Sequence, residues 1–93
     1  MNLNEIEILN QIEEYRTTAE KAKLNIKYYQ DCLRNPEPDI TLELQQQFYS
    51  RKIEEAENTI QKNKELILEF RKFLSAEVLE YYNQELFMVT LKA

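Results

Sequence analysis

Apolar residues recur with one spacing in two long stretches of this chain, and a single proline-containing segment separates the stretches. From Ile8 to Leu33, successive apolar positions are alternately four and three residues apart. From Tyr49 to Leu74, the positions follow the same alternation. This spacing keeps one side chain per turn on the same face of an α-helix, as in coiled coils. We therefore expect two long helices that pack along these two faces.

The segment between the stretches is the only strong helix break in the chain. Pro36 and Pro38 both disfavour the α conformation in the residue that precedes them. The chain contains no glycine, which leaves few residues suited to the tight turns of β-hairpins. We predict an all-α fold: an antiparallel helical hairpin resembling a coiled coil, with helices at about 4–34 and 40–74 and a loop at 35–39. Asp39 or Thr41 can cap the second helix.

Facing residues of an antiparallel pair have numbers with a constant sum, and two sums fit the apolar positions. A sum near 75 puts Ile26 opposite Tyr49 and needs only a short loop. A sum near 78 puts Tyr29 opposite Tyr49 and Ala22 opposite Ala56, and needs a longer loop. We favour the register with the shorter loop.

One polar residue, Asn63, interrupts the apolar positions of the second stretch. A buried amide at such a position commonly fixes the register or the oligomeric state of packed helices. We interpret Asn63 as a register-setting polar core residue. The alternative is that its side chain lies at the edge of the packed face and reaches water.

The C-terminal residues after about Ser75 are strongly apolar and extend beyond the first residues of the first helix in either register. On a helix, five of them fall within an arc about 100° wide, which is typical of a packed face. These five are Val78, Leu79, Tyr82, Leu86 and Val89. We expect a helical extension over about 76–91 that completes a bundle and contacts another protein, with Phe87 contacting a second surface.

Two arrangements can bury this extension. In the first, it folds back as a third helix capped by Ser75, which gives a three-helix bundle. In the second, it continues the second helix and pairs with another copy of the chain, which gives a dimeric four-helix bundle. Because no glycine or proline marks a turn near Ser75, we favour the continuous helix.

The chain lacks the residues and motifs of common catalytic and metal sites. It contains no histidine and no glycine-rich loop, and its single cysteine, Cys32, has no histidine to activate it. Helical di-metal sites usually combine glutamates with histidines. We therefore predict a protein that is not an enzyme and that uses neither a metal nor a cofactor.

Size and charge limit the partners of the chain. Its 93 residues suit a single helical domain that spans 1–93 and gains stability from self-association. A net charge of −5 argues against binding to nucleic-acid phosphates. The C-terminal stretch carries glutamates where membrane-surface helices carry lysine and arginine, so we predict no membrane binding. Without a signal peptide or a long apolar stretch in the sequence, we expect a cytoplasmic protein.

These features predict a small non-enzymatic protein–protein interaction module, an adaptor, scaffold or inhibitor that acts through helix–helix burial. Its partner is a second copy of itself or another protein, and we expect a homodimer or a subunit docked on a larger assembly. The tyrosine pairs Tyr28-Tyr29 and Tyr81-Tyr82 place Tyr28 and Tyr81 off the packed face, where either can meet a partner. The alternative is a regulator that inserts an acidic hairpin tip, formed by Glu37, Asp39 and Glu43, into the channel of an enzyme.

Overall fold

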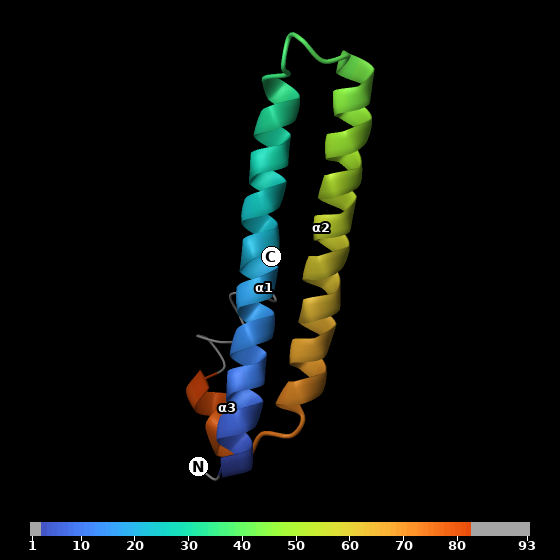
Figure 1. Ribbon diagram of the computed structural model, residues 1–93. Coiled ribbons are helices and arrows are strands. Elements are labelled where there is room, and N and C mark those ends of the chain that lie inside the picture. The colour runs from blue at the N-terminus through green and yellow to red at the C-terminus, as the bar shows by residue number, and fades with distance from the viewer. Residues whose placement is uncertain (1–2, 83–93) are drawn as a thin grey trace.

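Two long helices that pack against each other make up most of the protein (Figure 1). The computed structural model describes residues 3–82, and it describes Leu3, Tyr81 and Tyr82 by their backbone alone. The helices are α1 (Leu3–Arg34), α2 (Leu42–Arg71) and α3 (Ala76–Tyr82), and the described residues contain no strand. The molecule is a rod that measures 57 by 16 by 16 Å. The predicted all-helical class is confirmed.

The connection between α1 and α2 spans residues 35–41 and lies at one end of the rod (Figure 1). α1 ends directly before Asn35-Pro36, where the proline disfavours a further helical residue. Thr41 occupies the N-cap position of α2, but its side chain makes no capping hydrogen bond. The Thr41 backbone carbonyl instead accepts the first helical hydrogen bond, from the Gln45 N–H at 3.1 Å.

Aromatic contacts between the helices define how they are aligned. The Tyr29 and Tyr49 rings lie 6.0 Å apart between centroids, which is the pairing that belongs to the register with the longer loop. The register with the shorter loop, which we favoured, does not place these residues opposite each other. Nearer the other end, Tyr15 and Phe70 make an edge-to-face contact at 5.4 Å. Helical side chains lean toward the N-terminus of their own helix. Because α1 and α2 run in opposite directions, Tyr15 and Phe70 lean toward each other and their rings meet.

The chain beyond α2 turns back, so the continuous helix that we favoured for residues 72–82 is wrong. Backbone N–H groups of residues 72–74 bond to carbonyls three residues earlier, at 3.1 to 3.3 Å, which tightens and ends α2. The Ser75 hydroxyl then accepts a hydrogen bond from the Val78 N–H at 3.3 Å, as an N-cap does. A tightened last turn followed by a serine cap thus replaces the glycine or proline that we took to be necessary.

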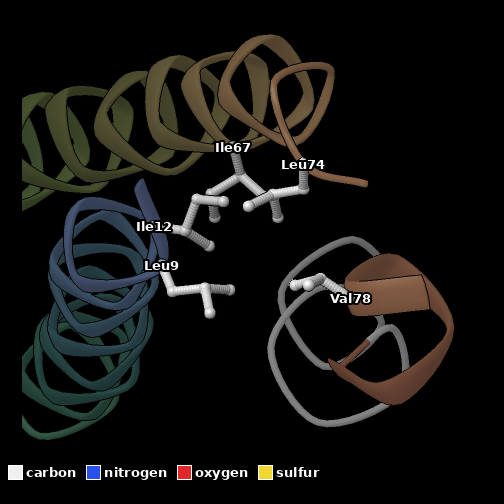
Figure 2. Packing of buried hydrophobic residues seen from close by; sticks show 5 residues of the cluster. All are labelled: Leu9, Ile12, Ile67, Leu74 and Val78. Carbon is white, nitrogen blue, oxygen red and sulfur yellow. The ribbon is translucent and has the colours of Figure 1, made fainter. Parts of the chain in front are cut away.

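The main hydrophobic core lies at the end of the rod opposite the loop, which we call the base. Figure 2 shows five side chains that converge there, Leu9 and Ile12 from α1, Ile67 from α2, Leu74 from the connection after α2 and Val78 from α3. Ile12 and Ile67 are fully buried. The first turn of α3 therefore covers the apolar end of the two long helices within one chain.

The base core predicts an uneven response to truncation of apolar side chains. Ile67→Ala removes a fully buried side chain, and we expect it to lower the free energy of unfolding by about 2–5 kcal/mol. Leu24→Ala is the control, because Leu24 is 67% exposed, and we expect a change within about 0.5 kcal/mol. Urea unfolding followed by circular dichroism measures both values. Equal losses in the two variants would contradict this assignment of the core.

Candidate protein-interaction surface

Large apolar side chains are exposed mainly in the half of the rod nearest the loop, residues 22–56, which we call the loop half. The buried residues of this half are Ala22, Gln45 and Ala56, which are small or polar. Its exposed large apolar residues are Leu24, Tyr28, Ile40, Leu42, Leu44 and Phe48. Two helices bury only the stripe that each turns toward the other, and small side chains fill little space between them. The loop half therefore contains six exposed large apolar side chains and no buried one.

Four rings from both helices form a continuous row across the loop half, which we call the aromatic row. Tyr28 contacts Tyr29 at 5.6 Å, Tyr29 contacts Tyr49 at 6.0 Å, and Tyr49 contacts Phe48 at 5.2 Å between centroids. Tyr28 is 62% exposed and Phe48 is 44% exposed, so both ends of the row are accessible. Aromatic side chains with one exposed face are typical anchors of protein–protein contacts.

Positive charge accompanies the Phe48 end of the row. The Arg51 guanidinium lies 5.9 Å from the centroid of the Phe48 ring, and the Lys52 ammonium lies 5.6 Å from it. Both distances fit cation–π interactions. The two cations also limit how the exposed ring can be approached, because a partner must accommodate their charge.

The half-buried Cys32 thiol influences two phenols of the aromatic row. Hydrogen bonding to the Cys32 sulfur raises the pKa of Tyr28, with electrostatic repulsion from Cys32 as the next cause. The same hydrogen bonding raises the pKa of Tyr49, with desolvation as the next cause. Cys32 thus favours the neutral form of both phenols.

These pKa shifts predict a stability loss at alkaline pH. A phenol whose pKa is raised by folding stabilises the folded state fully below its unfolded pKa of about 10, and this stabilisation is lost as the pH rises through the higher folded value. We expect Cys32→Ala to lower the pKa of Tyr28 and Tyr49 toward the ordinary value. Ultraviolet titration of tyrosinate absorbance, compared with wild type, measures the change, and superimposable titration curves would contradict the role of the thiol.

Gln45 organises the loop although it belongs to α2. Its amide nitrogen donates to the backbone carbonyls of Glu37 and Ile40, both at 2.8 Å. Its amide oxygen accepts from the Glu37 N–H, also at 2.8 Å. The side chain is 5% exposed, so these bonds satisfy a polar group that is buried. Gln45 therefore holds the loop against the first turn of α2.

The loop is expected to depend on this one amide. Gln45→Ala leaves three backbone partners without their bond, and we expect a loss of about 1–3 kcal/mol in the free energy of unfolding. Gln46→Ala is a matched control, because Gln46 is the neighbouring glutamine and is exposed. Denaturant unfolding of both variants provides the comparison. If the two variants were equally stable, Gln45 would have no special role.

The C-terminal residues that we predicted to contact a partner differ in burial and in whether the structure describes them. Val78 is 7% exposed and lies in the base core, so its side chain packs within its own chain. Leu79 is partly buried against the same core. Tyr82 is the last residue of α3, and its side chain lies outside the described set. The remaining predicted anchors also lie outside the described residues, namely Leu86, Phe87 and Val89.

Asn63 is buried, at 7% exposure, as we expected of a polar core residue. Its amide nitrogen donates to the Thr59 carbonyl of the same helix at 2.8 Å. This bond does not cross between the helices, so it does not by itself align them. The role of Asn63 in setting the register stays a prediction.

The acidic residues of the predicted tip, Glu37, Asp39 and Glu43, are all exposed. The Glu37 backbone is held by Gln45, whereas its carboxylate faces solvent. Among the described residues, no group of three acidic, cysteine or histidine side chains is arranged to hold a metal ion. In addition, none of the described helices is long and apolar enough to cross a membrane.

Sequence reasoning missed Leu44, Phe48 and Leu24 as surface candidates, although a signal was present. Leu44 and Phe48 are four residues apart, and so are Leu24 and Tyr28, which puts each pair on one helical face outside the heptad positions. Comparisons with protein-family models, with curated proteins and with solved structures found no match for this chain. The geometry of the chain itself therefore carries the functional interpretation.

Proposed function

We propose that this protein is a small non-enzymatic interaction module, an adaptor, scaffold or inhibitor, that buries helix surface against another protein. A homodimer in the cytoplasm is its basic form. The observation that carries this proposal is the exposure of large apolar side chains along the loop half, with the aromatic row at its centre. Contiguous exposed apolar surface on a small protein is typical of an interaction site.

The energetics of burial favour the aromatic row as the centre of such a contact. Fully burying one large apolar side chain contributes about 1.5–3 kcal/mol, so the two exposed rings at the ends of the row can supply a substantial share of a moderate affinity. Tyr28 also offers a hydroxyl, and Phe48 already carries two cations near its ring. Ring surface bordered by polar groups matches the composition of interface centres and rims.

The exposed acidic tip supports the second candidate, a regulator that inserts Glu37, Asp39 and Glu43 into the channel of an enzyme. All three carboxylates lie at the loop end of the rod or next to it and are exposed. The two candidates use different residues of the same end of the molecule. Substitution can therefore separate them.

Sedimentation equilibrium of the full chain over a wide concentration range tests the proposal. We expect a dimer, and we expect the double variant Tyr28→Ser/Phe48→Ser to raise its dissociation constant at least tenfold, because both rings lose their buried area. The triple variant Glu37→Ala/Asp39→Ala/Glu43→Ala is the control and should leave self-association within about threefold of wild type. Circular dichroism checks that each variant keeps its helices.

Two results would count against the proposed homodimer. A wild-type chain that stays monomeric at every concentration removes the self-association on which the proposal rests. A dimer that the tip variant weakens and the ring variant leaves unchanged would favour the acidic tip as the contact surface.

A further inference from the structure

One face of the α1–α2 pair carries a shallow groove that runs from the base to the aromatic row. It consists of three open hollows, and all the described residues that line them belong to α1 and α2. Counted from the base, the first and second hollows share Gln11 as a lining residue, and the second and third share Thr18 and Thr59. The groove is therefore continuous from about Asn4 to Tyr29.

Small side chains form the middle of this groove. Thr18 and Thr59 line two of its hollows, and Ala22 and Ala56 line the hollow nearest the aromatic row. Larger apolar side chains lie toward the base, where Tyr15 and Leu66 line the neighbouring hollow. Small residues at the centre permit close approach of another helical surface, because no long side chain stands between the backbones.

Six charged residues line the groove, namely Glu7, Glu14, Lys21, Lys52, Glu55 and Lys62, and four of them alternate in sign on its two sides. Glu14 on α1 and Lys62 on α2 line the same hollow, and Lys21 on α1 and Glu55 on α2 line the next one. Along each helix, the two charges are seven residues apart, which is two turns and returns to the same side of the helix. The sign therefore changes both across the groove and along it.

The two lysines of this pattern, Lys21 and Lys62, have no side-chain partner among residues 3–82. Among the described residues, no ion pair or hydrogen bond involves the side chain of Lys21 or Lys62. Glu14 accepts a hydrogen bond from Gln11 at 3.3 Å, and Glu55 lies 3.6 Å from the Lys52 ammonium. These are exposed contacts within one helix, so they leave the carboxylates able to accept further donors.

We propose that a second copy of this chain docks face to face on the groove, with its own four border charges against these four. This inference rests on the proposed homodimer and specifies its surface. When two copies face each other across a two-fold axis that lies in the plane of the face, each acid of these four residues meets a base. The chain thus carries its own electrostatic complement on one face.

Two axes in the plane of the face satisfy this charge pairing, one parallel and one perpendicular to the helices, and the aromatic row distinguishes between them. An axis parallel to the helices sets α1 against α2 of the partner at the same height, so that Glu14 meets Lys62 and Tyr28 comes near Phe48 of the other copy. An axis perpendicular to the helices sets Glu14 against Lys21 and places the aromatic row near the base of the other copy. Only the parallel axis joins the exposed rings of both copies, and we infer that axis.

The size of the face agrees with a dimer. Residues 4–28 of α1 extend over about 36 Å, at 1.5 Å per residue. With a width of 16 Å, each copy contributes a flat area of about 600 Å² before its corrugation is counted. The total for two copies is therefore about 1,200 Å², at the lower limit of stable specific interfaces. A contact of this size depends on good complementarity, which the charges supply.

Charge reversal tests the proposal by sedimentation equilibrium of the full chain. Glu14→Lys alone puts a lysine against Lys62 of the partner, and Lys62→Glu alone puts a glutamate against Glu14, so each should raise the dissociation constant about tenfold. The double variant Glu14→Lys/Lys62→Glu restores opposite charges and should return the constant to within about threefold of wild type. The double variant Glu14→Lys/Lys21→Glu should not.

Charge-matched controls lie away from the groove. Lys27→Glu and Glu57→Lys change the net charge by the same amounts as the test variants, and both residues are exposed and line none of the hollows. We expect neither control to change the dissociation constant more than threefold. Circular dichroism again confirms that each variant folds.

Each remaining outcome has a defined meaning. A dimer that tolerates both single reversals overturns the groove as its contact surface and leaves the proposed interaction module intact. Restoration by Glu14→Lys/Lys21→Glu in place of Glu14→Lys/Lys62→Glu overturns the parallel axis. A wild-type chain that never dimerises defeats this inference together with the proposed homodimer.

Discussion

The fold depends on how little surface two helices can bury against each other. Each helix turns one stripe toward its partner, and apolar residues outside that stripe stay exposed unless a third element covers them. At the base, α3 covers the open end through Val78, and the fully buried Ile12 and Ile67 lie there. In the loop half, the described residues provide no third element, and the exposed apolar side chains gather in that half. One constraint thus produces both the stable core and the surface available for a partner.

The heptad spacing was sufficient to predict two packed helices, because period and length are local properties of the sequence. The register was not predictable in this way. It depends on a loop at 35–41 that closes through Gln45, a residue outside the apolar pattern whose partners are backbone groups eight and five residues away. The turn after Arg71 was the less favoured of the two predicted arrangements for a related reason. It is made by hydrogen bonds and by the burial of Val78, and neither leaves a glycine or proline in the sequence.

The interaction surface could be predicted only in part. We predicted the contact surface in the strongly apolar C-terminal stretch, yet the described part of that stretch packs mainly on its own chain, through Val78 and Leu79. Tyr28 was recognised because a tyrosine pair places it outside the heptad face. Leu44 and Phe48 carry a similar spacing signal, but their exposure follows from the absence of a covering helix beside the described part of α2. That absence is a tertiary property, which a local pattern does not contain.

The charge distribution is compatible with the self-association that we propose for this acidic protein. A net charge of −5 repels two copies when they approach in random orientations. The groove is different, because its three glutamates and three lysines sum to zero, and four of them alternate in sign across and along it. At physiological ionic strength the screening length is about 8 Å, so distant acidic groups weaken while charges in contact across an interface keep most of their effect. In the proposed dimer, repulsion elsewhere on the surface disfavours other contacts and leaves the groove face as the favoured orientation.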